Sequence, residues 1–225
     1  GMFASATAIF SAGSSFRWVR DQLCRDLVNA AREQDADVYE LMTREAQSSP
    51  AGARGLLFNP SLAGGSSLDD SPDIRGAFLG LDLGHTRADV IRASMEGVAM
   101  GLRMALDELR KLTPLGREMT VVGGGSRSAL WRQIYADIYH LDVVKTNVDQ
   151  QAAALGAAAV AAVGTGLWKN FSRIDQIHTV ESVSKPNPAN RATYDQLQPI
   201  YALACKFQSQ LGRELAKARR NGVME

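Results

Sequence analysis

The stretch that decides the fold is VVGGGSRSALWRQIYADI, residues 121–138. Two β-branched residues run into three consecutive glycines, and an amphipathic helical pattern begins directly after them. Glycine has no Cβ, so a backbone built from it can approach a ligand closely, and the first N–H groups of the following helix have no partner within that helix. We therefore expect a nucleotide-binding corner here.

The alternation of strand and helix continues on both sides of this corner. The segments that follow residue 118 are predicted as strand 120–122, helix 127–139, strand 143–145 and helix 150–163. This order is typical of parallel strand pairing. The short strands 55–58 and 76–81 have no crossover helix between them, which favours an antiparallel pair. The expected fold class is α/β, with a mixed sheet flanked by helices.

Apolar residues at helical spacing predict further helices at 8–27, 38–47, 87–112 and 187–215. Within 87–112 the small residues Ala93, Gly97 and Gly101 are expected to let another element pack closely, whereas Glu96 is expected to be a solvated or capping charge. The last helix contains Pro199, where we expect a break or kink. Its inward face is expected to consist of Tyr194, Leu197, Tyr201, Ala204, Phe207 and Leu211.

Composition and charge limit the partners. The 225 residues are 45% hydrophobic and 22% charged, with a formal net charge of +1, so the chain has no strong field for nucleic acid or an anionic membrane. The longest apolar run, residues 152–167, is too short for a membrane span, and a buried helix is expected there. Gly1-Met2 resembles a start left by an expression vector.

Cysteine and histidine usage indicates neither a disulfide scaffold nor a metal site. Cys24 and Cys205 are the only cysteines, and His85, His140 and His178 lie in different predicted elements. Two isolated thiols suit a reducing compartment, so a cytoplasmic location is expected. No metal-binding residue is predicted.

Three other types of glycine-rich site fit the corner less well. A Walker A loop is excluded because no Gly-Lys-Ser or Gly-Lys-Thr follows. The spacing Gly123-x-Gly125-x-x-Ser128 approaches a Rossmann fingerprint, but Lys145 stands where the ribose-binding acid is expected. The sequence around Ser126 lacks the glycine that completes a nucleophile elbow.

Several segments together resemble the C-terminal half of FGGY-type carbohydrate kinases, and xylulokinase-like members fit best. These segments are AGSSFRW at 12–18, GAFLGL at 76–81, ASMEG at 93–97, the glycine corner with its helix, and AALGAA at 153–158. The resemblance covers nearly the whole chain. It implies a ribonuclease H-like, actin-like ATPase domain, residues 1–225, that binds nucleotide, while the N-terminal sugar-binding and catalytic domain of the family is absent.

The resemblance also implies roles for individual residues. It places Gly123, Gly124, Gly125 and Ser126 in the ATP-binding corner, with Gly124 and Gly125 against the adenosine, and Ser128 at a polar adenine contact. Gly13 and Arg17 are implied near the phosphates. Glycines remove steric bulk, Ser128 offers a donor and an acceptor, and Arg17 offsets phosphate charge. Phosphoryl transfer in the family implies Mg²⁺ with the ATP.

The sequence departs from xylulokinases where substrate is concerned. The long loop at 59–72 has Gly64-Gly65-Ser66-Ser67-Leu68 in place of the usual Gly-Glu-Arg-x-Pro turn, and Gln150 and Gln151 replace common acids. The expected substrate is therefore a ketopentose, a polyol or a related sugar. No aspartate of this chain lies in a sequence context typical of the general base. No catalytic residue is therefore predicted, and the chain alone is expected to be inactive.

The sequence leaves two alternative functions and the oligomeric state undecided. A non-catalytic actin-like module for binding or regulation would use the same fold, and a Rossmann-type dinucleotide module is the third reading. The expected partners are the sugar substrate and the absent N-terminal domain, and a homodimer is compatible with the sequence.

Overall fold

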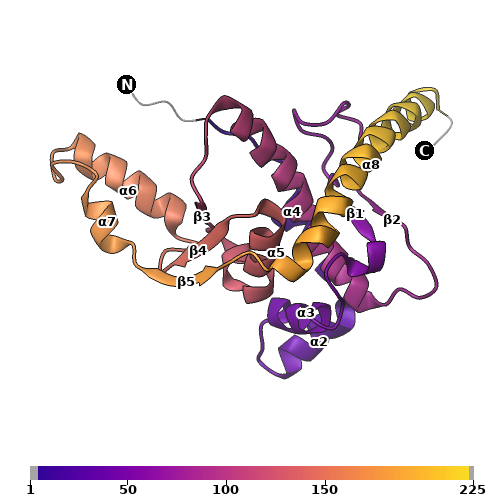
Figure 1. Ribbon diagram of the computed structural model, residues 1–225, viewed down its shortest axis with the longest axis horizontal. Helices are drawn as coiled ribbons and strands as arrows, with labels where there is room; N and C mark the ends of the chain where they lie inside the picture. Colours follow the sequence, from indigo (N-terminus) through magenta and orange to yellow (C-terminus); the bar gives the residue numbers. More distant parts are fainter. Residues whose placement is uncertain (1–4, 223–225) are drawn as a thin grey trace. The chain divides into compact units, whose positions relative to one another are not determined.

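The computed structural model describes residues 5–222 of the chain (Figure 1). The chain forms two compact units, one made of Gly1–Leu115 and Pro188–Glu225 and the other of Gly116–Asn187. The expectation that residues 1–225 form a single domain stays a prediction. The Gly1-Met2 start lies outside the described residues.

The first unit is mainly helical. It contains α1 (Gly13–Leu23), α2 (Arg25–Glu33), α3 (Val38–Ala46), the 3₁₀ turn η1 (Ala53–Gly55), β1 (Leu57–Asn59), β2 (Ala77–Leu79), α4 (Arg87–Leu112) and α8 (Pro188–Arg220). β1 and β2 pair antiparallel, as expected. The single helix expected at 8–27 is wrong, because the backbone leaves the helical conformation at Cys24 and α1 and α2 are separate helices.

Helix α4 is the core element of this unit, and its bounds are those expected. It begins with a capping box in which Thr86 and Asp89 exchange hydrogen bonds. Ile91, Met95 and Val98 are buried. At Gly97 an added Cβ would lie 2.8 Å from the carbonyl carbon of Phe58, so the backbone of β1 rests directly on the helix.

Helix α8 continues through Pro199 as one helix of 33 residues, so the chain does not break there, while a kink at Pro199 stays a prediction. Tyr194 and Tyr201 face inward as predicted, but Phe207 and Leu211 are 60% and 58% exposed. The inward face continues instead through Cys205, Gln208, Ser209 and Gly212. Gly212 sets this orientation, because an added Cβ there would lie 2.6 Å from the carbonyl carbon of Asp73.

The second unit contains the glycine corner. Its elements are β3 (Glu118–Thr120), η2 (Gly124–Arg127), α5 (Ala129–Tyr139), β4 (Asp142–Thr146), α6 (Ala152–Gly164), α7 (Arg173–Ile177) and β5 (Val180–Ser184). β3 and β4 pair in parallel and β5 pairs antiparallel with β4. The expected mixed sheet is therefore present, although the antiparallel β1–β2 pair forms a separate sheet and β5 was not predicted.

The apolar run at 152–167 contains helix α6, which is mostly exposed. The expectation of a buried helix is wrong for most of α6, since only Ala159 and Ala162 are buried and Val160 is 63% exposed. The small side chains of this helix are covered by neighbouring elements on one narrow side only. Across residues 5–222, no helix combines the length and apolar character needed to cross a membrane.

Candidate functional site

Two residues separate the glycine corner from β3, which ends at Thr120 rather than at residue 122 as expected, and the corner leads through η2 into α5. Gly123 has φ 84° and ψ −172°, a conformation that is essentially restricted to glycine. Its N–H donates to the carbonyl of Asp149, which ties the corner to the segment after β4. An added Cβ at Gly123 or Gly124 would meet no atom within 4 Å, so the corner is open on this side.

Hydrogen bonds within the corner fix its shape. Ser126 is fully buried, and its backbone N–H and its hydroxyl both donate to the carbonyl of Gly123. Arg132 reaches back from α5 and donates to the carbonyls of Ser126 and Arg127. Ser126 and Arg132 therefore hold the turn in place. No local sequence signal indicates this role of Arg132, because its partners lie five and six positions earlier.

Ser128 is the N-cap of α5. Its hydroxyl oxygen accepts a hydrogen bond from the N–H of Trp131 at 3.2 Å, which satisfies one of the open donors of the first turn. Gly125 lies beside the same helix, where an added Cβ would be 3.6 Å from the ring of Trp131 and from the hydroxyl of Tyr135. The wall of the corner on this side is thus aromatic.

Three stacked aromatic rings support that wall. The ring centroids of Trp131 and Tyr135 are 6.0 Å apart, and those of Tyr135 and Tyr139 are 5.4 Å apart. All three side chains are buried. Burial raises the pKa of Tyr135, so this hydroxyl stays protonated at neutral pH.

Gly13 and Arg17 lie in the other unit, on α1. Gly13 is the first residue of this helix, it is exposed, and the N-cap residue Ala12 makes no side-chain capping bond. No acid stands in the first turn, and Arg17 is exposed one turn further on. The structure therefore gathers Gly123 to Ser128 in one unit, and Gly13 with Arg17 in the other.

Asp137 has a structural role in the second unit. It is 2% exposed, and its carboxylate accepts hydrogen bonds from the Gln133 side chain and the Asn187 N–H, both at 2.7 Å. Gln133 also donates to the carbonyl of Lys185. These bonds tie α5 to the segment that follows β5.

Glu96 is the acceptor at the centre of a buried hydrogen-bonded cluster in the first unit. Its side chain is 2% exposed and lies in a cluster that joins α4, α8 and the turn before β1, so the prediction of a solvated or capping charge is wrong. One carboxylate oxygen accepts from Arg92 Nε at 2.7 Å, from the Tyr194 hydroxyl at 2.7 Å and from the Gly52 N–H at 3.0 Å. Burial raises the pKa of Glu96, while Arg92 and the hydrogen bonds act in the opposite direction.

The backbone next to this cluster is strained. Ala53 and Arg54 both have positive φ values, 44° and 56°, in a turn flanked by Gly52 and Gly55. Glu96 holds the first residue of this turn, and Arg54 pairs with the buried Asp89 at 3.5 Å. The cluster therefore sets the entry of the chain into β1. Sequence spacing gives no hint of it, because Gly52 and Tyr194 lie far from Glu96 along the chain.

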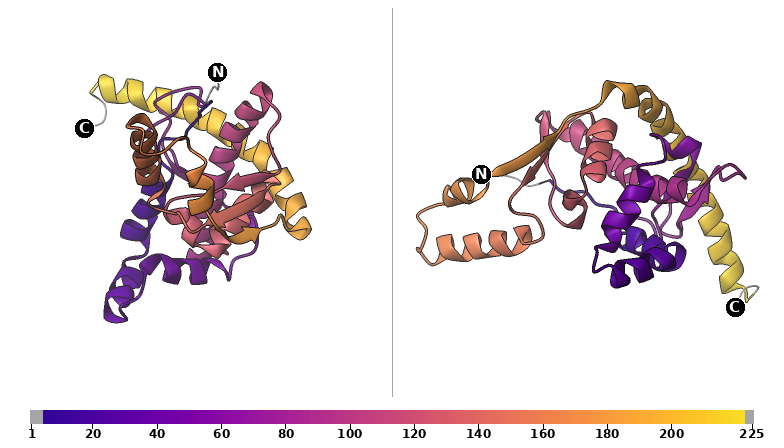
Figure 2. Two further views of the ribbon diagram at one scale, coloured as in Figure 1. Left: turned by 90° about the vertical axis from the view of Figure 1, so that its left-hand side faces the viewer. Right: turned by 90° about the horizontal axis from the view of Figure 1, so that it is seen from below.

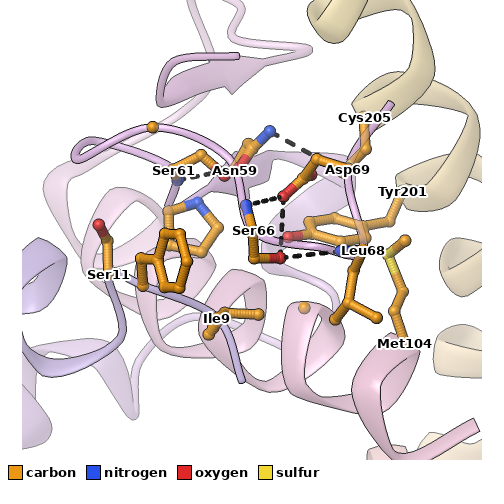
Figure 3. A pocket seen from close by; sticks show the side chains of 14 residues that line it. Ile9, Ser11, Asn59, Ser61, Ser66, Leu68, Asp69, Met104, Tyr201 and Cys205 are labelled. Carbon is orange, nitrogen blue, oxygen red and sulfur yellow. Dashed lines mark hydrogen bonds between the residues drawn. The ribbon is translucent and has the colours of Figure 1, made fainter. Parts of the chain in front are cut away.

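A small pocket of the first unit lies between the residue 9–11 segment, the loop after β1, and α8 (Figure 3). The cavity volume is about 20 Å³, which holds about one water molecule and is too small for a sugar. The loop after β1, residues 60–72, forms one side. Asp69 organises it by accepting hydrogen bonds from the N–H and hydroxyl of Ser66.

Within residues 5–222, no three His, Cys, Asp or Glu side chains are grouped closely enough to hold a metal ion. Cys24 and Cys205 are both buried free thiols. Burial raises the pKa of Cys24 to about 11 and that of Cys205 to about 12, so both are neutral thiols.

Comparison with known proteins agrees with this architecture. A family model, the FGGY family of carbohydrate kinases, C-terminal domain, matches residues 1–165. Xylulose kinase of Staphylococcus epidermidis is 31% identical over 206 residues, which are 91% of this chain and 39% of that protein. Gluconokinase of Bacillus licheniformis is 31% identical over 191 residues, 84% of this chain and 37% of that protein.

Solved structures are similar over the same part of the chain. Ligand-bound xylulose kinase from Lactobacillus acidophilus has a TM-score of 0.75 at 30% identity, covering 93% of this chain and 40% of that one. Plasmodium falciparum glycerol kinase with ADP shares the fold, with a TM-score of 0.66 at 20% identity over 87% of this chain and 37% of that one.

These relatives are much longer than this chain, which spans about two fifths of their length. The family match, in contrast, extends over most of the chain and includes α4, the glycine corner and α6. The fold is accordingly the actin-like ATPase fold of that domain. The chain belongs to the FGGY family of carbohydrate kinases, of which it carries the C-terminal domain.

Proposed function

We propose that the chain is the ATP-binding part of a sugar kinase that transfers the γ-phosphate of ATP to a hydroxyl of a ketopentose, a polyol or a related carbohydrate. Membership of a family of carbohydrate kinases supports phosphoryl transfer to a sugar. The relatives named as xylulose kinase and gluconokinase are equally identical to this chain, so a broad substrate class is proposed.

The observation that carries the proposal is the open backbone at Gly123 and Gly124. A side chain at either position would project into empty space, which is the space that a nucleoside lying against the corner needs. Gly125 would meet the same ligand beside the aromatic wall, and Ser126 would keep the turn rigid through its bonds to Gly123. Ser128 would contact the adenine with the hydroxyl that caps α5.

For the phosphates we propose Gly13 and Arg17. The start of α1 has no capping side chain and no acid in its first turn, so its N–H groups and partial positive charge are suited to an anion. The exposed guanidinium of Arg17 adds a full charge. Mg²⁺ is expected with the ATP, and it would neutralise phosphate charge when bound.

The proposal assigns no general base to this chain. The buried carboxylates Glu96, Asp89 and Asp137 are all engaged in hydrogen bonds that hold the fold. The base that takes the proton of the sugar hydroxyl would therefore belong to the N-terminal domain that the family carries. We expect the isolated chain to bind adenine nucleotide weakly and to phosphorylate no sugar, because a half-open site does not exclude water.

Thermal unfolding with MgATP tests the nucleotide site. At a hundred times the dissociation constant, ATP adds about 2.7 kcal/mol of stability. For a chain of this size that is a rise in Tm of about 5–10 °C. Gly124→Val should abolish the rise, because its side chain fills the open corner, while leaving the Tm without ligand unchanged.

Gly156→Val in α6 is the matched control, since an added Cβ there also meets nothing within 4 Å. It should keep the ATP response. No ATP response in the parent chain would contradict the nucleotide site and favour a non-catalytic actin-like module. A larger response to NAD or NADP would favour a dinucleotide module, and sugar phosphorylation by the isolated chain would overturn the assignment of the base.

A further inference from the structure

Tyr135 lies beside the glycine corner and has a hydroxyl that the fold itself does not use. It belongs to α5, which packs against β4 and β5 of the second unit (Figures 1 and 2). The residue is 7% exposed, and within the described residues 5–222 its hydroxyl makes no hydrogen bond. Burial alone raises the pKa of Tyr135, without a contribution from a charge or a hydrogen bond.

Two buried tyrosines of the first unit show the usual arrangement. The Tyr194 hydroxyl donates to Glu96 at 2.7 Å, and the Tyr201 hydroxyl is hydrogen-bonded to Cys205. Most buried polar side-chain atoms are hydrogen-bonded in this way, because a buried donor without an acceptor costs free energy. A buried hydroxyl without such a partner, beside a corner that is open to solvent, therefore indicates an acceptor that a ligand supplies.

Gly125 leaves the space next to this hydroxyl free. A Cβ added to Gly125 would lie 3.6 Å from the Tyr135 hydroxyl oxygen, which is an ordinary van der Waals distance. The φ of Gly125 is not positive, unlike that of Gly123, so an alanine would fit at position 125 without strain. Neither the backbone conformation nor the packing within the chain therefore requires glycine here. The close approach of a ligand to the backbone does, and such a ligand comes within reach of Tyr135.

We propose that the Tyr135 hydroxyl donates a hydrogen bond to the nucleoside of ATP, at an acceptor atom of the adenine or the ribose. This inference rests on the nucleotide site proposed above and adds to it a residue that selects the nucleoside. The hydroxyl is uncharged and belongs to a wall of stacked aromatic rings. Such a wall suits an uncharged, planar base, whereas a triphosphate would lose its hydration there without gaining a counter-charge.

Isothermal titration calorimetry of the whole chain with MgATP tests the proposal. Tyr135→Phe removes only the hydroxyl and should weaken binding about three- to tenfold, which is the contribution of one hydrogen bond. The Tm without ligand should stay the same or rise, because the hydroxyl has no partner within the fold to lose. Tyr139→Phe is the matched control. It makes the same change in the next ring of the stack, one turn further from the corner, and should leave the affinity unchanged.

Two partial ligands locate the contact on the nucleotide. Adenosine should lose affinity for Tyr135→Phe by the same factor as MgATP, whereas tripolyphosphate should bind the variant and the parent chain equally. Three results overturn this inference alone: equal affinity of variant and parent for MgATP, a loss for MgATP that adenosine does not share, or a lower Tm of the variant without ligand. A parent chain that binds no MgATP overturns the proposed function and this inference together.

Discussion

Adding one methyl group at Gly97 should disrupt the contact between α4 and β1. An added Cβ would lie 2.8 Å from the carbonyl carbon of Phe58 and closer still to its oxygen. Normal carbon contacts are about 3.5–4.0 Å, so the strand or the helix must shift by close to 1 Å. Both partners are buried backbone, so no flexible side chain can relieve the overlap.

The magnitude is the difference between two opposing effects. Alanine in a helix interior is about 1 kcal/mol more favourable than glycine. Overpacking of a core costs about 1–3 kcal/mol and occasionally more, and contact with backbone is at the upper end. We expect Gly97→Ala to lower the free energy of unfolding by about 2 kcal/mol, the difference between a cost of about 3 kcal/mol and a gain of about 1 kcal/mol.

Urea denaturation followed by circular dichroism measures this loss as a lower midpoint at unchanged m. Gly101→Ala on the same helix is the control. An added Cβ there would lie 3.2 Å from the Tyr201 hydroxyl, the end of a side chain that can move by a few tenths of an ångström. We expect a change within about 1 kcal/mol. Equal stability of Gly97→Ala and the parent chain would refute the close contact.

Two further predictions concern buried carboxylates of the first unit. Glu96→Ala should lower the free energy of unfolding by about 3–5 kcal/mol, because it leaves the Arg92 guanidinium buried without its counter-charge; a loss below about 1 kcal/mol in urea denaturation would contradict this. Asp89 should contribute to acid sensitivity: although burial acts to raise its pKa, hydrogen bonds from Ser49 and Thr86 leave that pKa lowered. The stabilisation by Asp89 is therefore complete above the unfolded-state pKa of about 4, and it is lost as the pH falls through the lower pKa of the folded state. Asp89→Asn should give a flatter dependence of Tm on pH in this range, and an unchanged slope would show that other groups are responsible.

The sequence determined the elements whose signals are local. The bounds of α4 follow from a regular apolar stripe, and the structure adds a capping box of Thr86 and Asp89 at its start. The glycine corner follows from a strand, three glycines and a helix, and Gly123 indeed has a backbone conformation restricted to glycine. The parallel pairing of β3 with β4 follows from the intervening helix α5. Each of these depends on residues within about one element of each other.

Only the tertiary structure decided features that depend on distant partners. Apolar residues occur on two sides of α8, and the close approach of Gly212 to Asp73 selected the inner one. Glu96 is buried because Gly52 and Tyr194, 44 and 98 residues away, supply its hydrogen bonds. β5 alternates polar and apolar residues weakly and is a strand because β4 offers it an edge. A residue's own neighbours report its helical or strand preference, but its burial is set by whatever the fold brings against it.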